Sequence, residues 1–136
     1  VLICALSGMM CITRESVNQI LSTKDSFDMT KGVIGEVANV ARAMKVDLPE
    51  NIEAEKIEYL LEHKEVAVSS MFSDLIRGNP LEVDVLNGAI SRLGKQNNIE
   101  TPLNDFICST LKPYNDRAKD ARVLGQKAGF YGPVIT

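Results

Sequence analysis

Apolar residues recur every three or four positions through most of this chain, and that spacing limits it to helices. Between Met29 and Met44 the spacing is that of an amphipathic helix, with apolar residues at Val33, Val37, Val40 and Ala41. A second clear stripe consists of Leu81, Val85, Leu86, Ala89, Ile90 and Leu93. Before the C-terminal tail, no stretch shows the sustained alternation of a strand. The sequence therefore predicts an all-α fold.

Capping and breaking residues divide the first half of the chain into helices. The run from Leu2 to Ile12 is apolar throughout, which predicts a buried helix. Thr13 is expected to cap a second helix, "TRESVNQIL", and "STKDSFDM" is expected to be a polar connection. The helix from Met29 to Met44 ends before Pro49, because proline disfavours helical geometry at the residue before it.

The second half of the chain is divided in the same way. Ile52, Ile57, Leu60 and Leu61 predict one helix, and Ser69 or Ser70 interrupts or re-caps it. "MFSDLIRG" predicts a short helix that Gly78 closes. Pro102 opens a further helix, whose core face is expected at Leu103, Phe106, Ile107 and Leu111. Residues 1–111 thus predict a helical domain. The locally basic residues 112–136 predict a tail that begins as a partly ordered, solvated helix.

Size and composition exclude several classes of protein. The chain has 136 residues, 45% hydrophobic and 24% charged, which is typical of one globular domain. A net charge of -3 argues against a nucleic-acid binder, because no broad basic surface is available for phosphates. The opening run "VLICALSGMMCI" is too short to cross a membrane and lacks the flanks of a signal peptide. We expect a cytoplasmic protein, and a helix that begins in mid-pattern predicts a piece of a longer one.

The residues that usually carry catalysis or bind metals are sparse. Cys4, Cys11 and Cys108 are widely spaced, and with the lone His63 they form neither a disulfide framework nor a zinc motif. Buried thiols and a solvated helix histidine are the simpler interpretations. A P-loop and the Gly-rich dinucleotide fingerprint are both absent. We therefore expect no metal and no catalysis by this chain alone.

One acid, Glu82, has two interpretations. With Asn79 as N-cap and Pro80 as first helical residue, Glu82 is at the third position and completes a capping box. The alternative is a ligand-binding role shared with Ser70, since the break at Gly78-Asn79-Pro80 allows two helix starts to face one cleft. Ser70 likewise has two interpretations, as a helix cap or as a ligand-binding residue. Spacing alone leaves both choices open.

The stretch "SSMFSDLIRGNPLEVDVLNGAI", followed by "NNIETP", resembles the C-terminal domain of the 2-dehydropantoate 2-reductase (ketopantoate reductase) family. Family positions fall in register without a gap from Ser70 to Gly88. They are Ser70-Met71, Asp74, Glu82, Asp84, Asn87-Gly88 and, later, Thr101-Pro102. "GEVANVARAMKVDLPEN" is similar to the family's Glu-led helix, with Glu36 matching that Glu. The resemblance covers Val1 to Leu111 and implies the helical bundle of ketopantoate reductase and 6-phosphogluconate dehydrogenase-like proteins.

The resemblance implies a two-domain enzyme that reduces 2-dehydropantoate to pantoate for pantothenate and coenzyme A synthesis. An N-terminal Rossmann domain, absent from this chain, is expected to bind NADPH, and the helical domain to bind the 2-oxo acid. By match to the family, Ser70 is a substrate-binding residue and Glu82 a cofactor-binding one. The family's catalytic lysine and one substrate-binding asparagine fall just before Val1, so no catalytic residue is expected in this chain.

Two positions depart from the family pattern. Cys4 and Arg14 stand where the family has asparagine, and a thiol does not replace an amide that both donates and accepts. One alternative is therefore a related 2-hydroxy-acid dehydrogenase with another substrate. Another is a stand-alone helical interaction or dimerisation module. Self-association is also expected, because the first helix is left partly uncovered when its partner domain is missing.

Overall fold

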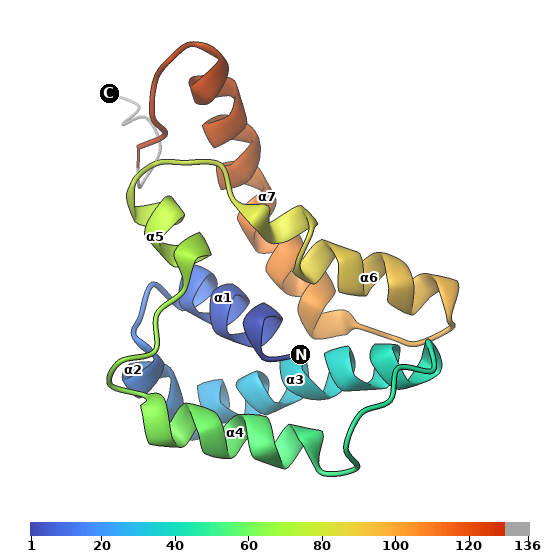
Figure 1. Ribbon diagram of the computed structural model, residues 1–136. Coiled ribbons are helices and arrows are strands. Elements are labelled where there is room, and N and C mark those ends of the chain that lie inside the picture. Colours follow the sequence, from blue (N-terminus) through green and yellow to red (C-terminus); the bar gives the residue numbers. More distant parts are fainter. Residues whose placement is uncertain (130–136) are drawn as a thin grey trace.

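The computed structural model describes residues 1–129, and every regular element in that range is helical. A short 3-10 helix, η1 (Glu82–Asp84), precedes α6 (Figure 1). The α-helices are α1 (Leu2–Thr13), α2 (Val17–Ser22), α3 (Lys24–Ala43), α4 (Ile52–His63), α5 (Ser70–Ile76), α6 (Asn87–Gln96) and α7 (Pro102–Val123). The all-α prediction is confirmed. The part of the predicted tail from residue 130 onward lies outside the described residues.

Helix α1 lies at the centre of the molecule, with α3, α5 and α7 packed around it (Figure 1). Ala5, Ser7 and Gly8 are all buried, and such small residues allow the neighbouring helices to come close. A Cβ atom on Gly8 would lie 2.9 Å from Cδ1 of Ile107 on α7. The prediction of a buried first helix is confirmed.

The junction between α1 and α2 differs from the prediction. Thr13 is the last residue of α1, and its Oγ1 donates a hydrogen bond to the carbonyl of Met9 at 2.7 Å. Ser16 caps α2 instead, because its Oγ accepts from the backbone N–H of Gln19 at 3.3 Å. The expectation that Thr13 caps the second helix is therefore wrong.

Helix α3 begins at Lys24, so the stretch "STKDSFDM" is mostly helical rather than a connection. Asp28 explains why these polar residues remain in the helix. Its carboxylate pairs with Nζ of Lys24 at 2.5 Å and with Nζ of Lys31 at 2.8 Å. Such pairs, three or four residues apart, lie on one helix surface and support it without burial.

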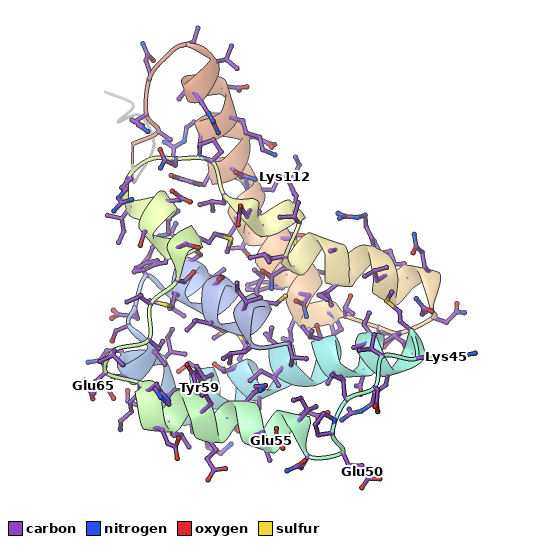
Figure 2. All side chains as sticks on the ribbon, in the orientation of Figure 1. Lys45, Glu50, Glu55, Tyr59, Glu65 and Lys112 are labelled. Carbon is purple, nitrogen blue, oxygen red and sulfur yellow. The ribbon has the colours of Figure 1, made fainter. Side chains whose placement is uncertain are left out.

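Helix α7 crosses the predicted boundary at Leu111 without a break and ends at Val123. Tyr114 and Ala118 are buried and extend the apolar face of Ile107 and Leu111 by two turns. Lys112 remains on the solvent-facing side, where its Nζ lies 2.7 Å from a carboxylate oxygen of Asp116 (Figure 2). After α7 the chain turns back toward α5, and Ala128 is buried there (Figure 1). The first part of the predicted solvated tail is therefore part of the core.

Candidate functional site

Two adjacent serines begin α5, and the structure gives them different roles. Ser69 is the N-cap, because its Oγ accepts from the N–H of Phe72 at 3.3 Å. The same hydroxyl donates to Oγ of Ser7 on α1 at 2.8 Å, and Ser69 is buried. Ser70 is exposed, and within residues 1–129 its hydroxyl makes no hydrogen bond. The cap is Ser69, which leaves the hydroxyl of Ser70 available to a ligand.

Glu82 is the first residue of η1 and is exposed. Helix α6 begins only at Asn87, so Glu82 is not the third residue of a helix that starts at Pro80. The amide of Asn79 does not cap a helix either, since its Oδ1 accepts from Nζ of Lys127 and its Nδ2 donates to Asp74 Oδ1 at 2.8 Å. Among the described residues the Glu82 carboxylate has no hydrogen bond or ion pair. The capping-box interpretation of Glu82 is therefore wrong.

The bend between Ser70 and Glu82 is held by contacts distant in sequence. Gly78 has a φ of 73°, a left-handed conformation that glycine adopts without strain. Its carbonyl accepts from the N–H of Ala128 at 3.1 Å, and a Cβ on Gly78 would collide with the carbonyl oxygen of Ala128. Asn115 Oδ1 accepts from the N–H of Leu81 at 2.7 Å. The bend is thus fixed by α7 and by the segment after it.

A charged cavity of about 350 Å³ lies beside this bend. The bend and the end of α5 form one wall, and the C-terminal end of α7 with the segment after it forms the other. Its charged lining residues are Asp74, Glu82, Arg122 and Lys127. A cavity lined by carboxylates and cations suits a polar ligand better than an apolar one.

Ser70 does not line this cavity, whereas Asp74 does. Both residues are on α5 and are separated by four positions, so they lie on the same face about one turn apart. The structure therefore places Glu82 in the cavity and Ser70 on the helix face that leads to it. A cleft shared by Ser70 and Glu82 stays a prediction.

A buried chain of hydrogen bonds connects α3, α7, α6 and α1. Glu36 on α3 accepts from the side-chain amide of Asn104 at 2.7 Å. Asn87 Nδ2 donates to Asn104 Oδ1 at 3.0 Å and to the backbone carbonyl of Cys4 at 3.1 Å. Asn87 and Asn104 are fully buried, so these bonds satisfy amide groups that water does not reach, whereas Oδ1 of Asn87 has no partner among the described residues. This series of hydrogen bonds holds the first turn of α1 in place.

The two departures from the family pattern have structural settings that the sequence did not show. Cys4 is buried, 6% exposed, and burial raises the pKa of its thiol. Arg14 is the C-cap of α1 with a φ of 63°, a left-handed conformation that asparagine adopts more readily than arginine. Arg14 is also half-buried.

The remaining candidates for chemistry have structural explanations. Burial raises the pKa of Cys11 to about 12, so its thiol is neutral at physiological pH. His63 stacks on the ring of Tyr59, at 4.1 Å between ring centres; Figure 2 labels Tyr59. No cluster of metal-ligating side chains occurs among residues 1–129. None of the described helices is long and apolar enough to cross a membrane.

The sequence and the fold match one family over most of the chain. Residues 1–115 match the family described as "Ketopantoate reductase PanE/ApbA C terminal". The chain belongs to the ketopantoate reductase family. The match is to the C-terminal domain of that family, which agrees with the resemblance found in the sequence.

Relatives of known sequence and structure support this assignment. A 2-dehydropantoate 2-reductase from Lactococcus lactis subsp. lactis (strain IL1403) is 32% identical over 105 residues, which are 75% of this chain and 34% of the relative. A PanE/ApbA family ketopantoate reductase from Ralstonia eutropha JMP134 has 30% identity and a TM-score of 0.77, over 87% of this chain and 39% of that one. D-mandelate dehydrogenase, solved with NADH and anilino(oxo)acetate, has 27% identity and a TM-score of 0.73, over 85% and 65%. The chain thus spans 34% of the length of the Lactococcus relative.

Sequence reasoning missed the residues of α7 that hold the bend. Tyr114 and Asn115 lie beyond the predicted boundary at Leu111, in the stretch assigned to the tail. A signal for them was present, because Ile107, Leu111, Tyr114 and Ala118 recur at three- and four-residue steps. Extending the buried face of the helix along this stripe places Asn115 beside the core.

Proposed function

We propose that this chain is the substrate-binding domain of an NADPH-dependent 2-dehydropantoate 2-reductase, which makes pantoate for pantothenate and coenzyme A synthesis. Membership of the ketopantoate reductase family over residues 1–115 supports the reaction class. The observation that carries the proposal is the environment of the Glu82 carboxylate. Its carboxylate is exposed, lines a cavity and has no structural partner among the described residues, as expected of a ligand-binding group.

In this proposal the work is divided between two domains. NADPH, when bound, supplies the hydride that reduces the substrate ketone, and an N-terminal Rossmann domain holds most of it. Glu82 fits a cofactor contact, since a free carboxylate accepts hydrogen bonds from ribose hydroxyls or a carboxamide. Ser70 donates to the 2-oxo acid through its free hydroxyl. A lysine upstream of Val1 protonates the oxygen that becomes the alcohol.

The test is an assay of the complete protein encoded by the gene that contains this chain. We expect loss of NADPH absorbance that depends on 2-dehydropantoate, and a Gly-rich strand–turn–helix and a lysine in the sequence before Val1. A complete protein without a dinucleotide-binding domain would instead support the stand-alone interaction module. The isolated chain should bind NADPH weakly. Calorimetry showing tight binding would contradict the proposal that the N-terminal domain holds most of the cofactor.

Self-association of the chain stays a prediction.

A second candidate, favoured by Cys4, is a related 2-hydroxy-acid dehydrogenase. Cys4 occupies a family asparagine position, and its buried thiol does not offer the donor and acceptor of an amide. The likeness to D-mandelate dehydrogenase, at 27% identity, adds to this alternative. The ratio of kcat/KM for 2-dehydropantoate and for the 2-oxo acid of mandelate decides between the two substrates.

A further inference from the structure

Two consecutive residues of α7, Tyr114 and Asn115, make hydrogen bonds to the backbone on either side of the bend that separates the candidate site residues. Asn115 Oδ1 accepts from the N–H of Leu81 at 2.7 Å. The hydroxyl of Tyr114 lies 3.1 Å from both the Leu75 and the Asn79 carbonyl oxygens, so its proton is shared between them. Asn115 is 2% exposed and Tyr114 is 7% exposed, so water does not substitute for these bonds. These hydrogen bonds hold the end of α5 and the start of η1 against α7.

The position of Glu82 depends on its backbone alone. Its carboxylate has no partner among the described residues, so no side-chain contact orients it. On the C-terminal side, the Glu82 carbonyl accepts from the N–H groups of Val85 and Leu86, which are local contacts within the same turn. On the N-terminal side, the bond from Leu81 to Asn115 links the peptide just before Glu82 to another helix. A surface pair between Lys119 and Asp84 also joins η1 to α7. Asn115 is the buried side chain that ties the peptide before Glu82 to α7.

We propose that Asn115 is a positioning residue for Glu82, acting through the backbone of Leu81. This inference rests on the proposed function of Glu82 as a ligand-contacting acid. Tyr114 assists by fixing the preceding turn at Leu75 and Asn79. Loss of the Asn115 amide leaves the Leu81 N–H without its partner, and η1 then moves relative to α7.

A purely structural role for Asn115 makes a different prediction. Loss of any buried hydrogen bond lowers stability, so a fall in melting temperature alone does not separate the two roles. A positioning role requires a fall in catalysis that depends on the Glu82 carboxylate. Non-additivity between the two sites is the signature, because residues that act as a unit do not contribute independently.

The experiment uses the complete protein with four single variants, and it repeats Asn115→Leu in a Glu82→Gln background. Asn115→Leu removes the acceptor at similar volume, and Asn115→Asp keeps an oxygen for the Leu81 N–H. Tyr114→Phe removes only the hydroxyl. Thr30→Val is the matched control, since Thr30 is 2% exposed and its hydroxyl donates to the Ser26 carbonyl at 2.8 Å within α3. Each protein is assayed for melting temperature, kcat and KM.

We expect Asn115→Leu to lower kcat/KM on the order of 10- to 100-fold, the range for a misplaced catalytic group. Asn115→Asp should retain most of the activity, and Tyr114→Phe should show a smaller loss than Asn115→Leu. Thr30→Val should lower the melting temperature and leave kcat unchanged. In a Glu82→Gln background, Asn115→Leu should cause no further loss. Amide exchange at residues 81–85 should accelerate in Asn115→Leu, while α6 stays protected.

The contradicting results are distinct. Full kcat/KM in Asn115→Leu, or losses that multiply in the double variant, overturns the positioning role and leaves the proposed function standing. Unchanged amide exchange at residues 81–85 overturns the proposed route through Leu81. If Asn115→Leu does not fold, Tyr114→Phe in the protein with native Glu82 decides instead. Unchanged kcat/KM in Tyr114→Phe, together with unchanged amide exchange at residues 81–85, would overturn the positioning role. A wild-type protein that reduces no 2-oxo acid refutes the proposed function, and the positioning role fails with it.

Discussion

Glu36 and Asn104 are joined by two hydrogen bonds across the core. Oε2 of Glu36 accepts from the backbone N–H of Asn104 at 2.9 Å and from its side-chain amide at 2.7 Å. Oε1 accepts from the N–H of Leu103 at 2.8 Å. Thr101, the N-cap residue of α7, makes no capping bond with its own side chain. A glutamate on α3 therefore satisfies N–H groups that the first turn of α7 leaves unpaired.

Substitution of Glu36 is the first test of this arrangement. We expect Glu36→Ala to lower the free energy of unfolding by about 2 kcal/mol, the scale of a lost cap and charged hydrogen bonds. Glu36→Gln should cost less, because one amide oxygen remains to accept. Urea denaturation measures both. Glu58→Ala is the control, since Glu58 is an exposed acid on α4, and an equal loss there would contradict the capping role.

Two glycines in helices should respond to alanine with opposite signs. A Cβ on Gly8 would lie 2.9 Å from Ile107 Cδ1 and 3.1 Å from Asn87 Nδ2, so Gly8→Ala should destabilise by about 1–3 kcal/mol through overpacking. A Cβ on Gly35 meets nothing within 4 Å. Gly35→Ala should therefore stabilise by roughly 0.5–1 kcal/mol, from the better helix propensity of alanine. Equal melting temperatures of the two variants would contradict the close packing at Gly8.

The sequence was sufficient to predict the fold class and most of the helices. Helical periodicity is local, so the stripe of Val33, Val37 and Val40 was interpreted correctly. The start of α3 was missed, because the ion pairs of Asp28 stabilise a helical turn that has little apolar pattern. The burial of α7 beyond Leu111 was missed, because the stretch was expected to be solvated, although the stripe continues to Ala118.

The candidate site was harder to predict because tertiary contacts determine its backbone conformation. The stretch "NPLE" has the local signals of a helix start. In the structure, however, the side chain of Asn115 accepts a hydrogen bond from the N–H of Leu81, and the chain forms η1 instead. The partners in this contact are 34 residues apart, and no local rule connects them. The family resemblance identified Ser70 and Glu82, whereas the structure adds the contacts that hold the bend between them.

Ser69 and Ser70 should separate stability from binding. Ser69→Ala removes the cap of α5 and the bond to Ser7, so we expect a loss of about 1–2 kcal/mol in unfolding free energy. Ser70→Ala removes an exposed hydroxyl with no partner in the described residues, so stability should change by less than about 0.5 kcal/mol. In the complete protein Ser70→Ala should raise KM for the 2-oxo acid. The reverse pattern would assign the cap to Ser70.

Stability should fall at alkaline pH through Cys11. Burial raises the pKa of its thiol from 9.0 to about 12, so the folded state keeps a proton that the unfolded state loses. This contribution is fully present below pH 9 and is lost as the pH rises from 9 toward 12. Between those values the unfolding free energy should decrease by about 1.4 kcal/mol per pH unit more than in Cys11→Ala. Parallel pH profiles of the two proteins would show that Cys11 is not responsible.

Glu82→Gln should affect catalysis and leave the fold intact. The carboxylate is exposed and has no partner among the described residues, so the unfolding free energy should change by less than about 0.5 kcal/mol. A hydrogen bond to a charged group contributes more than one to a neutral amide, so kcat/KM in the complete protein should fall by about 10- to 100-fold. Chemical denaturation and steady-state kinetics measure the two effects.

Asp84→Asn is the matched control, because Asp84 is an exposed acid in the same turn. Its carboxylate lies 2.8 Å from Nζ of Lys119, a surface pair whose loss should cost at most about 1 kcal/mol. Activity should be unaffected, since Asp84 does not line the cavity. An equal loss of kcat/KM in Asp84→Asn would show that the negative charge of η1 matters rather than the placement of Glu82. Unchanged kinetics in Glu82→Gln would remove Glu82 from the site.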